Sequence, residues 1–229
     1  MEIEYIDGLI DFLKKRAAKI EVPEIPPNLP QTEEYLLMRR REGAIVERSL
    51  RFESGLSATE FERIENTYGI MFPPDLRALL ERAVPVTDPY PASGRGPFPS
   101  WRDLKKLKDD FGYPTEVILD DICEGDFWPE EWGGRPADRS NREKIGRERM
   151  LEIPRMIPVR EHQYLPSEPC ETGNPVFSIY WKDSVYAGRD LADYFHSWFG
   201  TPLPEWSRRT FRRIRFWSEV EPEVPTASE

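Results

Sequence analysis

The amino-acid sequence predicts an α+β protein in which helices pack against a mixed or antiparallel sheet, preceded by an N-terminal helical extension. Several segments repeat apolar residues at the spacing of an amphipathic helix. Other short runs are rich in β-branched and aromatic residues and are bounded by Pro or Gly, as strands are. Among 229 residues, 7 Trp, 9 Tyr and 12 Phe supply large apolar side chains, so the chain has the material for a buried core.

The predicted N-terminal extension covers residues 1–50. Apolar residues at helical spacing predict an amphipathic helix over residues 3–20. Four prolines between residues 23 and 30 predict a stiff connector, because proline has no amide hydrogen to continue a helix. A second, short helix is expected over residues 32–41, and residues 44–52 are left open between loop and strand.

The clearest local signal is a helical hairpin. Ser57 and Glu60 have the spacing of a capping box, and Gly69 stands where a helix ends in the left-handed conformation. Pro73 and Pro74 then open a further helix, since proline suits the first helical turn. The apolar stripe of this further helix is Leu76, Leu79, Leu80 and Ala83.

Strands are predicted in the C-terminal half, over residues 151–159 and 175–181. A turn at residues 182–184 and a return strand at 185–187 would complete a β-hairpin with the second of them. A helix is predicted to follow, with the apolar stripe Leu191, Tyr194, Phe195, Trp198 and Phe199. We expect Leu191, Tyr194 and Trp198 to be buried against the strand before the hairpin turn.

A last helix is predicted over residues 206–220, and it carries five Arg residues around Phe211, Ile214 and Trp217. The remaining residues favour a disordered acidic tail. The sequence therefore predicts an α+β domain over residues 51–217 and a tail over residues 218–229.

Residues 109–134 are strongly acidic, with nine Asp or Glu and no Lys or Arg. They follow a short helix expected around residues 101–107 and precede residues 135–149, which are basic and expected to be solvated. Carboxylates steer a basic partner, and aromatic residues among them are the usual anchors of protein interfaces. The candidate partner-binding residues are Asp109, Asp110, Asp120, Asp121, Glu124, Asp126, Trp128, Glu130, Glu131 and Trp132.

Two interpretations of Trp128 and Trp132 stay open: anchors for a partner, or core residues of a strand and turn. Calcium binding by the neighbouring acids is disfavoured, because their spacing is not that of an EF-hand loop. The sequence therefore predicts no metal ligand and no cofactor.

Catalytic motifs are absent from the sequence, which has no G-x-S-x-G, H-E-x-x-H, P-loop or dinucleotide fingerprint. Of its two histidines, His162 is expected to make structural hydrogen bonds and His196 to lie on the surface. Cys123 and Cys170 lack the spacing of metal ligands and are expected to be reduced thiols. We therefore predict no catalytic residue.

A net charge of −10 disfavours nucleic acid as a partner, because such binding relies on Lys and Arg neutralising phosphates. The acidic first residues do not resemble a secretory signal, and no apolar run reaches the ~18 residues of a membrane span. These observations predict a cytoplasmic protein that does not contact a membrane. The oligomeric state stays open.

Several blocks of the sequence resemble one known family. The first is the helix from Leu56 to Glu65 followed by Tyr68-Gly69-Ile70 and Pro73-Pro74-Asp75-Leu76. Later blocks are Phe127-Trp128-Pro129-Glu130-Glu131-Trp132-Gly133-Gly134-Arg135-Pro136, residues 157–166, residues 173–180 and residues 187–195. Over residues 50–217 the chain resembles the SUKH superfamily, the Smi/Knr-like domains named after yeast regulators of cell-wall assembly. Glu161 and Ala187 depart from the pattern, standing where a small and an aromatic residue are usual.

The resemblance implies an α+β fold that holds other proteins and has no known catalytic activity or cofactor. Many bacterial relatives are immunity proteins that neutralise toxins, nucleases among them, whereas the yeast relatives are interaction hubs. The leading hypothesis is thus an immunity-type protein that binds a basic toxin domain through an acidic face. The alternatives are a cytoplasmic regulatory scaffold and, more remotely, an unrecognised hydrolase.

Overall fold

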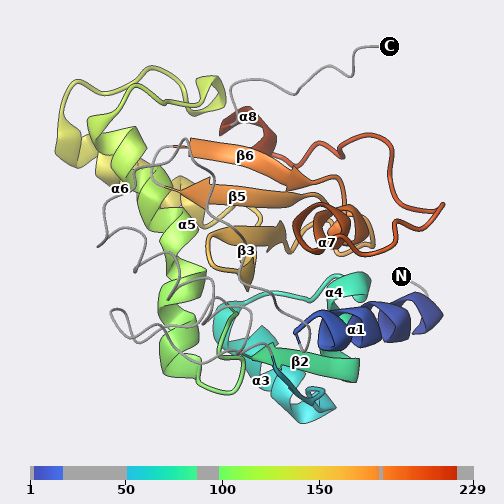
Figure 1. Ribbon diagram of the computed structural model, residues 1–229. Coiled ribbons are helices and arrows are strands. Elements are labelled where there is room, and N and C mark those ends of the chain that lie inside the picture. Colours follow the sequence, from blue (N-terminus) through green and yellow to red (C-terminus); the bar gives the residue numbers. More distant parts are fainter. Residues whose placement is uncertain (1–2, 18–50, 87–97, 181–182, 221–229) are drawn as a thin grey trace, which may run out of the picture.

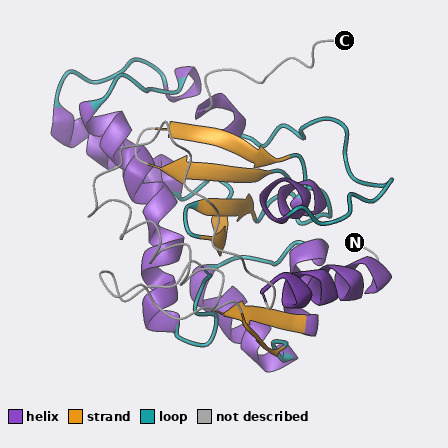
Figure 2. Cartoon of the chain, viewed as in Figure 1, coloured by secondary structure: helices purple, strands orange, loops and turns teal. Residues whose placement is uncertain are grey.

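The computed structural model describes residues 3–17, 51–86, 98–180 and 183–220 (Figure 1). It has the α+β fold that the sequence predicts, and among the described residues both sheets are antiparallel (Figure 2). The elements are α1 Ile3–Ala17, β1 Arg51–Ser54, α3 Ala58–Tyr68, α4 Pro74–Arg82, β2 Ala83–Val86, α5 Leu104–Glu124, the 3-10 helix η1 Glu130–Trp132, α6 Arg139–Met150, β3 Met156–Arg160, β4 Gln163–Pro166, β5 Val176–Tyr180, β6 Asp183–Gly188, α7 Leu191–Phe199 and α8 Trp217–Val220.

Several predictions fall outside the described residues: the connector over 23–30, the helix over 32–41 and the tail from residue 221 on. The predicted N-terminal helix is confirmed as α1, whose apolar side chains are buried and which contacts α4. The first three residues of the predicted tail, 218–220, belong to α8.

The four-stranded sheet, in the order β3-β4-β5-β6, separates two hydrophobic cores. Side chains alternate between the two faces of a strand, so neighbouring residues enter different cores. Ile157 and its partner Leu165 join the first core, which also contains α1, α3, α4 and α7. Tyr164 and its partner Phe177 join the second core on the opposite face. Both faces of the sheet are therefore buried.

The long helix α5 belongs to both cores. Leu107 and Phe111 in its first half pack in the first core, whereas Ile118, Leu119 and Ile122 pack in the second. Figure 1 shows α5 running along one side of the molecule, so that its C-terminal end lies away from α1, α3 and α4. The residues after α5 are thus held beside the second core.

The helix ends follow the sequence signals. Ser57 and Glu60 form the predicted capping box at the start of α3, and Gly69 ends that helix with φ of 60°. Asp190 accepts a hydrogen bond from the Asp193 amide at the start of α7, and Gly200 ends α7 in the left-handed conformation. The hairpin formed by β5 and β6 is confirmed as well.

Two predictions near the C-terminus are wrong. Leu191 and Tyr194 are buried as expected, but Trp198 is 46% exposed, because it lies outside the group of α7 side chains that pack in the first core. The predicted helix over residues 206–220 is reduced to α8. Its first half instead forms loops held by tertiary contacts, and Phe216 at φ of 67° interrupts helical geometry before α8.

One strand boundary differs from the prediction, and two short strands were not predicted. The strand expected over residues 151–159 begins only at Met156, because the preceding residues continue from α6 as turns. The strands β2 and β4, of four residues each, are not predicted by the sequence pattern. Both contain a proline, and both lie beside longer segments with stronger signals.

Candidate functional site

The acidic segment 109–134 is mostly helical. Its first part belongs to α5, which has 21 residues and replaces the short helix expected around residues 101–107. Asp103 caps the helix by accepting from the amides of Lys105 and Lys106 at 3.1 and 3.3 Å. Pro114 lies buried inside α5 and removes one amide donor, yet the apolar stripe continues on both sides of it. Burial of that stripe in two cores outweighs the missing hydrogen bond.

The basic segment after the loop folds back onto α5, and most of residues 135–149 are exposed, as expected. Most of it forms α6, and Gly146 of this helix is buried against α5. A Cβ atom at Gly146 would lie 2.9 Å from Leu119 Cδ2 and 3.4 Å from Ile122 Cγ2. The two helices therefore approach each other closely at this point.

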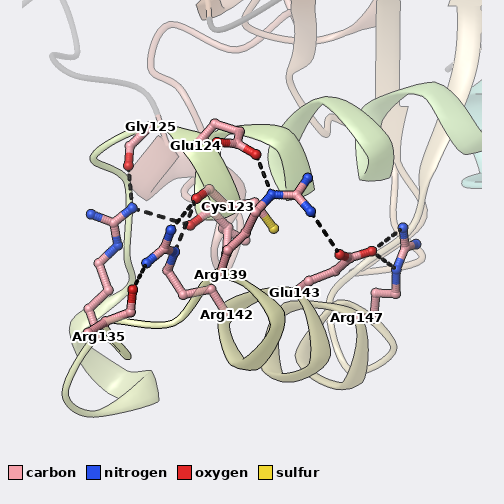
Figure 3. Close-up of polar contacts among 10 residues, drawn as sticks. Cys123, Glu124, Gly125, Arg135, Arg139, Arg142, Glu143 and Arg147 are labelled. Atoms are coloured by element: carbon pink, nitrogen blue, oxygen red, sulfur yellow. Dashed lines mark hydrogen bonds and ion pairs between the residues drawn. The ribbon is translucent and has the colours of Figure 1, made fainter.

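Ion pairs join the two helices, and Figure 3 shows the pair between Arg139 and Glu124. The Arg139 guanidinium pairs with Glu124 on α5 and, at 3.6 Å, with Glu143. The Arg147 guanidinium pairs with Glu116 on α5 at 3.4 Å and with Glu143 at 3.1 Å. All these side chains are partly exposed, so each pair contributes little stability. The predicted binding residue Glu124 is nevertheless engaged within the molecule.

Two further arginines fix the loop that joins α5 to α6 (Figure 3). Arg142 Nη2 donates to the Cys123 carbonyl at 2.7 Å, and Arg142 Nη1 donates to the Pro136 and Ala137 carbonyls at 3.0 and 2.8 Å. Arg135 Nη2 donates to the Gly125 carbonyl. Cations are favourable at a helix C-terminus, where carbonyls lack helical partners. These arginines, which the sequence analysis did not single out, therefore hold the loop against α5.

The two candidate tryptophans lie in this loop and are half-buried. Trp128 Nε1–H donates to the Gly133 carbonyl at 2.8 Å. The Trp128 and Trp132 rings meet edge to face with centroids 5.5 Å apart, and Trp132 stacks on Phe216 with centroids 5.9 Å apart. Both rings thus pack at the margin of the second core while part of each remains accessible.

The candidate acids fall into three groups. Asp109 and Asp110 lie in the first half of α5, and a helix of 15 residues separates Asp109 from Glu124 by about 22 Å. Asp109, Asp110 and Asp121 already interact with other groups of the protein. The exposed acids with no hydrogen-bond or ion-pair partner among the described residues are Asp120, Asp126, Glu130 and Glu131. The structure therefore does not bring all the candidates together. The four carboxylates without such partners lie in the last turns of α5 and in the loop after it.

A second cleft lies elsewhere, between α4, α7 and the loops at residues 172–173 and 206–208, with a volume of about 580 Å³. Two buried carboxylates line it. Asp75 accepts from the amides of Leu76 and Gly173, and Asp190 accepts from the amides of Asp193 and Arg208 and from the Ser207 hydroxyl. Burial raises the pKa of Asp75, and the two amides oppose this shift.

The histidines occupy different surroundings. His162 is partly buried, with a ring nitrogen 3.2 Å from Gln163 Nε2 and its ring beside Tyr180. Burial lowers the pKa of His162, although the Glu161 carboxylate opposes this shift. His196 is exposed, as predicted, and its Nδ1 lies 2.6 Å from the Thr201 carbonyl. Cys123 is a buried free thiol, and Cys170 is a partly buried one.

Comparisons of the chain with protein-family models, with curated proteins and with solved structures find no match. Among the described residues, no three or more His, Cys, Asp and Glu side chains gather as metal ligands do. None of the helices described is both long and apolar enough to cross a membrane.

Proposed function

We propose that the chain is a non-enzymatic binding protein that holds a basic protein partner at the end of α5 and the loop after it. The observation that carries this proposal is a group of four exposed carboxylates, at the end of α5 and in the loop after it, that have no hydrogen-bond or ion-pair partner among the described residues. Two half-buried tryptophans lie in the same fixed loop. Carboxylates raise the rate of encounter with a basic surface, and aromatic side chains supply the buried contact that slows dissociation.

The charge balance of α5, α6 and the loop between them supports a basic partner. Residues 104–150 contain twelve acidic and nine basic side chains, so pairing between α5 and α6 leaves an excess of three negative charges. The arginine contacts to backbone carbonyls fix the loop before any partner arrives. A fixed loop loses less conformational entropy on binding than a mobile one.

The proposed partner is a toxin domain, in line with the resemblance of the sequence to SUKH immunity proteins. Stoichiometric masking requires a binding surface and no active site. A regulatory scaffold for an endogenous protein would use the same surface, so the two roles differ only in the partner. Co-expression separates them: in a toxin-neutralising role, the chain restores growth of cells that express the toxin encoded beside it, whereas a scaffold does not.

The binding surface is tested by charge reversal. We expect Asp120, Asp126, Glu130 and Glu131 changed together to Lys to lose the partner in a pull-down from the native host. The matched control reverses four exposed acids elsewhere, Asp11, Glu62, Glu205 and Glu219, with the same change in net charge. If both variants lose the partner equally, net charge alone accounts for binding and the proposed surface is wrong.

The rival hydrolase is tested at His162. Since the pKa of His162 is lowered by burial and its ring contacts Gln163 and Tyr180, we assign it a packing role. His162→Ala is expected to leave partner binding within about threefold of wild type, measured by calorimetry. A folded His162→Ala protein that has lost its biological effect while still binding the partner would support catalysis instead.

A further inference from the structure

The cleft beside α4 and α7 has the size of a small-molecule site. Its volume of about 580 Å³ falls within the ~300–1,000 Å³ usual for such sites. Leu191, Ala192 and Trp206 supply its apolar lining, and the Trp206 ring is 37% exposed. The cleft adjoins α4, and the C-terminal end of α5 lies away from that helix (Figure 1). It is therefore separate from the surface proposed above.

Charged groups of both signs line the cleft without pairing with one another. They belong to Asp75, Asp190 and Arg208. Among the described residues, the Arg208 guanidinium forms no ion pair and donates no hydrogen bond, although the residue is only partly exposed. A partly buried guanidinium without an acceptor is unfavourable, so Arg208 calls for an acceptor from outside the chain.

Gly173 holds two of these groups close to each other. Its amide donates to Asp75 Oδ2 at 2.9 Å. Its φ is 86°, and a Cβ atom at this position would lie 2.5 Å from Arg208 Nε. Only glycine therefore allows the Arg208 side chain to lie against this loop. A single residue thus fixes a carboxylate and a guanidinium at the wall of the same cleft.

The two carboxylates differ in how far their charge is used by the fold. Asp190 caps α7 and accepts from two amides and the Ser207 hydroxyl. Asp75 accepts from the amides of Leu76 and Gly173, and a carboxylate offers about four lone-pair positions. Since Asp75 is only 2% exposed, burial raises its pKa despite these amides. An ammonium group beside Asp75 would offset that cost.

We infer that the cleft binds a free α-amino acid with an apolar side chain, its ammonium paired with Asp75 and its carboxylate paired with Arg208. A zwitterion matches a lining of both signs, whereas a ligand with one charge leaves one of the two groups without a partner. The guanidinium can donate two parallel hydrogen bonds to the ligand carboxylate. The apolar side chain lies against Trp206. This small-molecule site goes beyond the proposed function, which concerns a protein partner at another surface.

The test is calorimetric titration of the full-length protein with L-phenylalanine and with L-leucine. Two analogues each lack one charge: N-acetyl-L-phenylalanine has no ammonium, and L-phenylalanine amide has no carboxylate. We expect saturable binding of the amino acids and at least about tenfold weaker binding of each analogue, because each leaves a charged group unpaired. The indole Nε1–H resonance of Trp206, assigned by comparison with Trp206→Phe, should shift on binding and so place the ligand in the cleft.

Neighbouring arginines provide matched variants. Arg208→Gln should weaken binding of L-phenylalanine at least about tenfold and leave binding of its amide within about twofold of wild type. Arg209→Gln should retain wild-type binding of both, because Arg209 is exposed and does not line the cleft. Asp75→Asn should remove the preference for L-phenylalanine over its N-acetyl form, and if this variant does not fold, the N-acetyl analogue tests the same contact in wild type.

Three results would each overturn the inference. The first is the absence of saturable binding of both amino acids. The second is binding of either analogue as tight as that of L-phenylalanine, which would mean that one charge suffices. The third is an equal loss in Arg208→Gln and Arg209→Gln, which would assign the effect to net charge. The charge reversals at the end of α5 test the protein-binding surface separately, so either site can fail while the other stands.

Discussion

Asp75 keeps a carboxylate in a nearly water-free position at the start of α4. The amides of Leu76 and Gly173 each donate to one of its oxygens at 2.9 Å, so the carboxylate connects α4 to a loop 98 residues away. Burial nevertheless raises its pKa, which means that the charged form is less favourable in the folded state than in water. This residue links local structure to the pH dependence of stability.

A raised folded-state pKa sets the sign of that dependence. The stabilising contribution is fully present below the ordinary aspartate pKa of about 3.9 and is lost as pH rises through the raised folded value. Asp75→Asn does not titrate, so we expect wild type to gain stability relative to this variant as pH falls toward about 4. Urea denaturation of both proteins across this range measures the difference. If the stability of wild type relative to Asp75→Asn stays constant or falls on acidification, the prediction is wrong.

Within the candidate site, arginines of the same segment make contacts of different kinds. Arg142 is partly buried and donates to three carbonyls at the end of α5 and in the following loop. Arg139 is more exposed and contacts only carboxylates among the described residues. In the sequence, both are members of a basic run. Only the fold shows that Arg142 fixes the loop through carbonyl contacts, whereas Arg139 forms exposed ion pairs.

We therefore expect Arg142→Met to destabilise the protein by about 1.5–3 kcal/mol, the usual value for hydrogen bonds that involve a charged group. Arg139→Met should change the unfolding midpoint much less, because exposed ion pairs are weak. Chemical denaturation measures both. Equal losses in the two variants would mean that the carbonyl contacts do not hold the loop.

At the scale of elements, the two helices with signals at both ends, α3 and α7, are predicted from the sequence. Ser57, Glu60 and Gly69 mark α3 at both ends, and Asp190 and Gly200 do the same for α7. The extent of α5 is missed because Pro114 and a run of acids resemble a loop locally. Its stability comes from burial in two cores, which are formed by residues far away in the sequence.

The opposite error occurs at residues 206–220, where apolar spacing alone predicts a helix. Here the Arg208 amide and the Ser207 hydroxyl bind Asp190, and Arg212 binds Asn174. These contacts reach back to earlier segments, so tertiary structure overrides local periodicity. No pattern within the segment itself indicates them.

The helix α7 allows a direct measurement of how burial varies along one stripe. Leu191 is 1% exposed in the first core, whereas Trp198 is 46% exposed and lies with its ring 5.7 Å from the Arg160 guanidinium. Leu191→Ala should cost about 2–5 kcal/mol, as core truncations do. Trp198→Ala should cost roughly 1 kcal/mol, because it loses mainly a cation–π contact. Thermal unfolding compares them, and a larger loss for Trp198→Ala would contradict the assigned packing.

At the scale of the whole molecule, α5 joins the two cores and carries its C-terminal end to one side (Figure 1). From the sequence, the candidate site could be predicted as an acidic segment with two tryptophans. It could not be divided into paired and unpaired acids, because the pairing depends on how α6 folds back onto α5. The structure reduces ten candidate residues to a smaller group near the loop.

That group determines the expected kinetics of binding. Exposed charges act over ~8–10 Å at physiological ionic strength, so association with a basic partner should be fast at low salt and slower at high salt. Reversal of Asp120, Asp126, Glu130 and Glu131 to Lys should lower the association rate by at least about tenfold at low salt. These side chains have no partners in the described residues, so thermal stability should change little.

The tryptophans should affect the dissociation rate rather than the association rate. Trp128→Phe keeps an aromatic ring but loses the hydrogen bond to the Gly133 carbonyl and part of the accessible surface. A central aromatic anchor acts mainly on the dissociation rate, so we expect faster dissociation with an association rate within about threefold of wild type. Surface plasmon resonance over a series of salt concentrations resolves both rates. Association that is insensitive to salt, together with unchanged dissociation for Trp128→Phe, would place the interface on another face of the molecule.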